Sequence, residues 1–266
     1  MKNPVLKQIV QECNVFLLDM DGTINIGDYP IGDMQNTLQK LRTAGKIIVY
    51  LTNNSSRAEE EIRDKLVSLG FWSDKDFIYS SGLATLAYLK EFYGDKRVHL
   101  FATDSVKNEF IRSGIVLDEE SPEVCVLTYD TTATFDKISR FHRSLEKDTL
   151  YIASHPDLVC PSDKGFQPDL GSFIRLFEGS SNRLPERICG KPYPIMGEYV
   201  KKFFNISPER ILMVGDRLST DIRFGVNCGF HTLLVFSGDA TPESYELSSD
   251  RADAALLDLN AITEYL

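Results

Sequence analysis

The sequence predicts an α/β fold in which helices cover both faces of a parallel sheet and a second domain is inserted into the chain. Short, continuous apolar runs such as VFLL (15–18) alternate with segments whose apolar residues recur at helical spacing. Strands that are apolar on both faces are typical of buried parallel sheets. Residues 82–181 have candidate strands and helices of their own and are numerous enough to form an independent domain.

Four strand segments make up the predicted sheet. They span residues 15–18, 47–51, 211–214 and 232–236. The helices predicted after the first three strands span residues 34–45, 58–70 and 221–229. In the first of these helices Leu38 and Leu41 share one face and Gly45 marks the end, which is typical of a helix packed on a sheet.

The inserted domain is predicted over residues 82–181, with the sheet domain built from residues 1–81 and 182–266. Its candidate strands are VHLFA, VCVLTY and LYIA, and a helix is predicted over residues 135–147. A loop punctuated by Pro and Gly is predicted over residues 154–171.

The composition limits the classes of partner. There are 29 Lys and Arg residues against 39 Asp and Glu, a net charge of −10 that disfavours nucleic acid and anionic membranes. No apolar run is long enough to span a bilayer, and the first residues lack the apolar core of a signal peptide, so we expect a cytoplasmic protein. The five cysteines are scattered without metal-binding spacing and are expected to be reduced thiols.

Four short polar stretches lie where predicted strands end or helices begin. They are DMDGT (19–23), LTNNSS (51–56), GKP (190–192) and GDRLSTD (215–221). Each alone has a structural explanation as a helix cap, a turn or a loop. Ligands of parallel sheets bind beyond the carboxyl ends of the strands, which places Asp19, Thr52 and Asp216 on one rim. Their joint occurrence at such junctions therefore indicates a functional site.

Several acids on one rim repel each other, and a divalent cation can hold them together. Carboxylate oxygens and water suit Mg²⁺, which uses few protein ligands. Asp19 and Asp216 are the predicted carboxylate ligands, and the backbone carbonyl of Asp21 can supply another oxygen. Asp221 is expected to be an outer or weaker ligand.

The pair of acids in DMDGT suggests a division of roles. Beside Mg²⁺, Asp19 can approach an anionic phosphate and attack phosphorus to form an aspartyl-phosphate. Asp21 can then donate a proton to the leaving oxygen and later accept one from water. Gly22 allows the sharp turn that follows.

The remaining stretches supply positive charge and hydrogen-bond donors. The Thr52 hydroxyl and the backbone N–H of Asn53 can bind phosphate oxygens, and Asn54 is a further candidate in the same stretch. Lys191 can neutralise charge on the phosphoryl group and on Asp19, because phosphoryl transfer depends mainly on positioning and charge stabilisation.

The four stretches resemble the four motifs of the haloacid dehalogenase-like phosphatases. LTNNSS, GKPYP and GDRLSTDI are similar to the branch that contains NagD and para-nitrophenyl-phosphatase-like enzymes. The resemblance implies a Rossmann-like, doubly wound core with an inserted α/β cap, dependence on Mg²⁺, hydrolysis of small phosphate monoesters and a homodimer formed through the cap. It also implies the following roles: Asp19 as nucleophile, Asp21 as acid/base, Thr52 and Lys191 as phosphate binders, and Asp216 as metal ligand.

The cap is where the resemblance places the choice of substrate. The loop 154–171 is the candidate substrate-facing edge, with His155 as a candidate substrate-binding residue, although a hydrogen-bonded structural histidine is the simpler interpretation of His155 alone.

Two other functions use the same chemistry. A phosphotransferase or phosphomutase would pass the phosphoryl group from Asp19 to an alcohol or sugar, and a receiver-like signalling module would store it.

Overall fold

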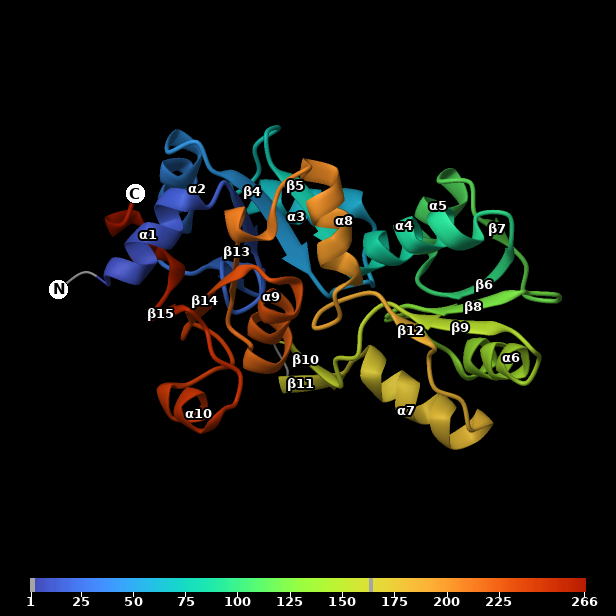
Figure 1. The fold of residues 1–266 in the computed structure, drawn as a ribbon. Helices are drawn as coiled ribbons and strands as arrows, with labels where there is room; N and C mark the ends of the chain where they lie inside the picture. Colours follow the sequence, from blue (N-terminus) through green and yellow to red (C-terminus); the bar gives the residue numbers. More distant parts are fainter. Residues whose placement is uncertain (1–2, 163–164) are drawn as a thin grey trace. The chain divides into compact units, whose positions relative to one another are not determined.

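The computed structural model describes residues 3–162 and 165–266, and its contacts divide the chain into two compact units (Figure 1). The first unit comprises Met1–Thr52, Ile62–Tyr79 and Lys191–Leu266, and the second comprises Asn53–Glu61 and Ser80–Gly190. The domain boundaries at residues 82 and 181 stay a prediction, because these units are defined by contacts and not by independent folding.

The first unit is built on a six-stranded sheet in the order β15-β14-β13-β1-β4-β5. Its strands are β1 (Val15–Leu18), β4 (Ile47–Thr52), β5 (Phe77–Ser80), β13 (Ile211–Gly215), β14 (His231–Val235) and β15 (Ala254–Leu256). β1 lies at the centre, parallel to β13 and β4, with Leu18 opposite Val214 and Tyr50. The predicted parallel α/β core is therefore confirmed, and each of the four predicted strands agrees with its observed bounds to within one residue.

Helices cover this sheet because their apolar faces have nowhere else to be buried. They are α1 (Pro4–Glu12), α2 (Met34–Thr43), α3 (Glu59–Ser68), α8 (Ile195–Phe204) and α9 (Arg223–Cys228). The short helix α10 (Pro242–Leu247) has no buried residue. A π-helical segment, Leu218–Ile222, precedes α9, and 3-10 turns span Pro208–Arg210 and Leu259–Glu264. Leu38 and Leu41 of α2 are fully buried in one core with Phe16 and Leu212, as the helical spacing predicts.

The second unit has its own five-stranded parallel sheet, in the order β12-β9-β8-β6-β7. The strands are β6 (Arg97–Phe101), β7 (Val116–Leu117), β8 (Val124–Leu127), β9 (Leu150–Ala153) and β12 (Arg187–Ile188). The helices are α4 (Ser81–Tyr93), α5 (Asp104–Arg112), α6 (Phe135–Leu145) and α7 (Leu170–Ser181). Figure 1 shows α4 and α5 on one face of this sheet and α6 and α7 on the other. Buried aromatic side chains, including Phe101, Phe141 and Phe177, fill the face under α6 and α7.

The segment predicted as a loop over 154–171 contains regular structure. β10 (Val159–Ser162) and β11 (Gly165–Pro168) pair antiparallel, and α7 begins at Leu170. Proline is tolerated in such a two-stranded ribbon because each strand has an edge that needs no backbone donor. Residues 163 and 164 of the predicted loop lie outside the described residues.

A second short ribbon pairs β2 (Asn25–Ile26) with β3 (Tyr29–Pro30) shortly after the DMDGT stretch.

Among the described residues, no helix combines the length and the apolar character needed to cross a lipid bilayer.

Candidate active site

The carboxyl ends of β1, β4 and β13 bring the predicted residues to one edge of the first unit's sheet. Asp19 directly follows β1, Thr52 ends β4 and Asp216 directly follows β13. The parallel register sets these strand ends side by side. Three carboxylate oxygens, one each from Asp19, Asp216 and Asp221, lie within 4.8 Å of one another. Three acids at positions 19, 216 and 221 of the chain therefore form one cluster.

Lys191 is buried within this cluster. Its Nζ donates to Asp19 Oδ1 at 2.6 Å and to Asp221 Oδ1 at 2.6 Å, and it reaches the Leu51 carbonyl at 3.3 Å. Burial opposes the positive charge, but the two carboxylates outweigh it and raise the pKa of Lys191 above its ordinary value. Lys191 is therefore a fixed cation that orients two of the acids.

The acids are crowded enough to disfavour their own ionisation. Burial raises the pKa of Asp19 well above its ordinary value, against the opposing effect of Lys191. Burial also raises the pKa of Asp216 to about 6, and the charge of Asp221 adds to this shift. A bound dication would reverse the effect, since it favours the charged carboxylates. The oxygen donors of the cluster and the raised pKa values of Asp19 and Asp216 therefore suit a divalent metal ion.

Asp216 is held by donors from two loops. Thr23 Oγ1 donates to Oδ1 at 3.3 Å, and the backbone N–H of Asp239 donates to Oδ2 at 2.7 Å. Two glycines approach the same carboxylate: a Cβ on Gly22 would lie 2.3 Å from Oδ2, and one on Gly238 would lie 2.0 Å from it. Gly22 also has a φ of 97°, which a side chain strongly disfavours. Gly22 is therefore required by the site as well as by the turn, and Gly238 is required by its close approach to Asp216.

Asp21 lies outside the buried cluster in a more accessible position. Its side chain is 43% exposed, compared with 14% for Asp19. Asn25 Nδ2 donates to Asp21 Oδ1 at 2.7 Å, and Lys65 Nζ donates to the same oxygen at 3.2 Å. Neither donor is predicted from the sequence. Asn25 lies two residues after the DMDGT stretch, and this closeness is a signal that could have identified it, whereas Lys65 on α3 carries no sequence signal of this contact.

Asn53 and Asn54 follow Thr52 in the chain but belong by their contacts to the second unit. Asn53 Nδ2 donates to Asp157 Oδ2 at 3.0 Å. Asn54 Oδ1 accepts hydrogen bonds from the backbone N–H of Ser56 at 2.9 Å and from its hydroxyl at 2.8 Å. These contacts organise the loop, and the roles of both asparagines in substrate binding stay predictions.

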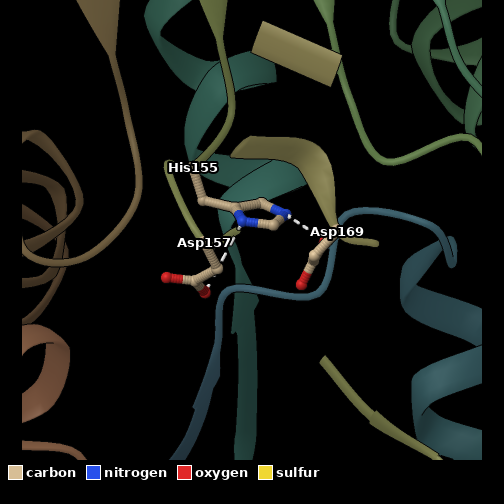
Figure 2. A group of neighbouring side chains, drawn as sticks. All are labelled: His155, Asp157 and Asp169. Atoms are coloured by element: carbon tan, nitrogen blue, oxygen red, sulfur yellow. Dashed lines mark ion pairs between the residues drawn. The ribbon is translucent and has the colours of Figure 1, made fainter. Parts of the chain in front are cut away.

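His155 also belongs to the second unit, where it is fully buried. Its imidazole lies between the carboxylates of Asp157 and Asp169 (Figure 2). The role of His155 in substrate binding stays a prediction.

Comparison with known proteins connects this geometry to a family. A model described as haloacid dehalogenase-like hydrolase matches residues 16–116, and a HAD-hydrolase-like model matches residues 188–262. The chain is similar to an acid sugar phosphatase of Staphylococcus haemolyticus, with 27% identity over 94% of this chain and 95% of the relative. It is also similar to 5′-nucleotidase YutF of Bacillus subtilis, with 26% identity over 94% of this chain and 96% of the relative. The crystal structure of a 4-nitrophenylphosphatase from Thermotoga maritima superimposes with a TM-score of 0.92 and 35% identity, covering 96% of this chain and 98% of that one.

Proposed function

The chain belongs to the haloacid dehalogenase-like hydrolase family and is a phosphatase, and on this premise we propose that it hydrolyses phosphate monoesters of small metabolites with Asp19 as nucleophile and Mg²⁺ as the metal. One observation carries the proposal. Lys191 Nζ contacts both Asp19 and Asp221 at 2.6 Å within the cluster that also contains Asp216. A buried cation among three acids is an arrangement that a structural role does not require, because buried charges are costly.

The reaction takes place in two displacements at phosphorus. An Asp19 oxygen attacks the phosphorus atom, the bond from phosphorus to the ester oxygen breaks, and Asp21 donates a proton to the leaving oxygen. Water then attacks the phosphorus of the aspartyl-phosphate and gives a proton to Asp21, and the bond from phosphorus to the Asp19 oxygen breaks. Inorganic phosphate leaves, and Asp19 and Asp21 return to their starting states.

The contacts of Asp21 support its role as the acid/base. Both described donors to its side chain, Asn25 and Lys65, act on Oδ1. We therefore assign proton transfer to Oδ2. The exposure of this side chain suits an acid that must exchange protons with a leaving group and with water.

The carboxylate cluster fits Mg²⁺, which prefers oxygen donors and few protein ligands. We assign direct ligation to Asp19 and Asp216, with the backbone carbonyl of Asp21 as a further ligand. Asp221 is assigned a place beyond the direct ligands, because Oδ1 accepts from Lys191 and Oδ2 accepts from the Arg217 N–H at 3.0 Å. When bound, Mg²⁺ supplies positive charge that allows an anionic phosphate to approach Asp19.

Lys191 and Thr52 are the residues that we assign to the phosphoryl group. The ammonium of Lys191 holds Asp19 in place and stabilises charge that develops on the phosphoryl oxygens. Thr52 is the last residue of β4, at the same edge of the sheet, and we assign its hydroxyl a hydrogen bond to phosphate. Asn53, Asn54 and His155 stay candidates for contacts with the substrate.

The substrate class follows from the relatives, whose names indicate sugar phosphates, nucleotides and a generic aryl phosphate. A panel of these esters, assayed for released inorganic phosphate with Mg²⁺ present, tests the proposal. We expect turnover of several monoesters that stops in excess chelator and returns when Mg²⁺ is restored. Full activity in chelator would reject the metal, and phosphate appearing on added alcohol in place of water would favour the phosphotransferase.

A further inference from the structure

The second unit contains its own group of metal-binding side chains: His155, Asp157 and Asp169 (Figure 2). His155 Nδ1 lies 3.6 Å from Asp157 Oδ2, and Nε2 lies 3.6 Å from Asp169 Oδ1. His155 and Asp157 precede the β10–β11 hairpin, and Asp169 directly follows it. The three side chains therefore join the two ends of the hairpin.

The histidine in this group is buried and its ring nitrogens are unsatisfied. The residue is fully buried, and within residues 3–162 and 165–266 neither Nδ1 nor Nε2 has a hydrogen-bond partner. The 3.6 Å separations are too long for hydrogen bonds to the carboxylates. A buried polar group in this state costs free energy, so the arrangement calls for a ligand that the imidazole can bind.

The two carboxylates are anchored by other donors. Asn53 Nδ2 donates to Asp157 Oδ2 at 3.0 Å, and the backbone N–H of Leu170 donates to Asp169 Oδ1 at 2.7 Å, where Asp169 caps α7. These bonds fix the positions of the acids on either side of the ring. Hydrogen-bonded carboxylates next to a histidine are typical of metal sites, because the bonds orient the ligands before the metal binds.

We propose that His155, Asp157 and Asp169 bind a first-row transition-metal dication such as Zn²⁺ at the base of the β10–β11 hairpin. One nitrogen and one oxygen from each carboxylate lie within 4.8 Å of one another. The ligands of a tetrahedral Zn²⁺ lie roughly 3.4 Å apart, so changes of up to about 1.4 Å in these separations would bring the three donors into place, with water as the fourth ligand. The imidazole selects such a metal over Mg²⁺, which takes oxygen ligands. The ion would tie together the two ends of the hairpin.

Metal stoichiometry tests the site separately from the Asp19 cluster. The untagged full chain is stripped with chelator, loaded with Zn²⁺ alone and freed of excess metal by gel filtration. The Asp216→Asn variant weakens the first cluster, and we expect it to retain one Zn²⁺ per chain. Adding Asp169→Asn should weaken this Zn²⁺ binding at least about 100-fold. Asparagine caps helices as well as aspartate does, so this variant preserves the start of α7, and circular dichroism checks its fold.

Nitrogen coordination gives a second, independent readout. Cu²⁺ bound to the Asp216→Asn chain should show nitrogen coupling in its electron paramagnetic resonance spectrum, because the Asp19 cluster contains no imidazole. His155→Gln should remove this coupling, whereas His142→Gln, a change on helix α6, should preserve it. The proposal is overturned if Asp216→Asn binds no Zn²⁺, if Asp169→Asn leaves binding unchanged, or if the coupling survives His155→Gln.

Discussion

The two units bury basic side chains in different ways. In the first unit Lys191 has carboxylates of Asp19 and Asp221 at 2.6 Å, and its pKa is raised. In the second unit His99 has the neutral Ser144 hydroxyl at 2.7 Å from Nδ1, and burial lowers its pKa to about 4. Burial disfavours the charge in both cases. Carboxylates at hydrogen-bond distance keep Lys191 charged, whereas a hydroxyl partner leaves His99 neutral.

His155 stands between these cases. Two carboxylates face it, as they do Lys191, but at 3.6 Å they are too distant for hydrogen bonds. The distance from a buried base to its acids therefore distinguishes the closed ion-pair network at Lys191 from the unsatisfied ring nitrogens at His155.

The largest expected effect comes from removing one of the acids beside Lys191. Asp19→Asn keeps the shape of the side chain and removes the nucleophilic charge, so we expect phosphate release to fall by more than about 10⁴-fold. Initial rates with 4-nitrophenyl phosphate and circular dichroism check activity and fold. Asp28→Asn, at an exposed acid in the β2–β3 turn, is the matched control and should retain activity. Near-normal rates in Asp19→Asn would remove Asp19 from the mechanism.

Removing the base itself should have the next largest effect. Lys191→Met leaves Asp19 and Asp221 buried without their cation, which should cost about 3–5 kcal/mol in the free energy of unfolding of the metal-free protein. We expect turnover to fall about 10²–10³-fold as well. Urea denaturation and steady-state rates measure the two effects. Lys40→Met, at an exposed lysine of α2, should change neither, and equal stability of the two variants would contradict the ion-pair network.

The pH dependence of the free energy of unfolding tests whether His99 of the second unit is neutral. The unfolded chain protonates this imidazole near pH 6.5, whereas folded His99 does so only near pH 4. Between these values the unfolded state binds more protons, so stability falls as the pH falls, by about 3 kcal/mol in total. The difference between wild type and His99→Gln in urea denaturation isolates this contribution. His142→Gln serves as the control, and a pH-independent difference between wild type and His99→Gln would contradict the neutral state of His99.

The smallest expected effect concerns the backbone around the acids of the first unit. Gly22 and Gly45 both have positive φ, at 97° and 76°, so alanine at either should cost about 1–2 kcal/mol of stability. Only at Gly22 would the new Cβ meet Asp216 Oδ2, whereas no described atom lies within 4 Å of a Cβ at Gly45. We therefore expect Gly22→Ala alone to reduce turnover, by about tenfold or more. Equal rates in the two variants would show that Asp216 tolerates displacement.

Much of the first unit could be predicted from the sequence because its signals are local. Continuous apolar runs mark the strands, and polar residues directly after them must lie at the carboxyl edge of a parallel sheet. Asp19, Thr52 and Asp216 were assigned to that edge in this way, and the structure brings Asp19 and Asp216 together with Lys191. The β10–β11 hairpin was missed because Pro and Gly also mark loops.

The class of fold, the four motifs and the family can be predicted from the sequence, since each depends on residues that are close together in the chain. Which side chains from distant segments meet is settled by tertiary packing alone. Lys65 reaches Asp21 from a helix, Gly238 packs on Asp216, and His155 is enclosed by two acids from opposite ends of a hairpin. Distance and burial decide whether such groups pair, bind a ligand or stay neutral, and both quantities arise only when separate segments of the chain pack together.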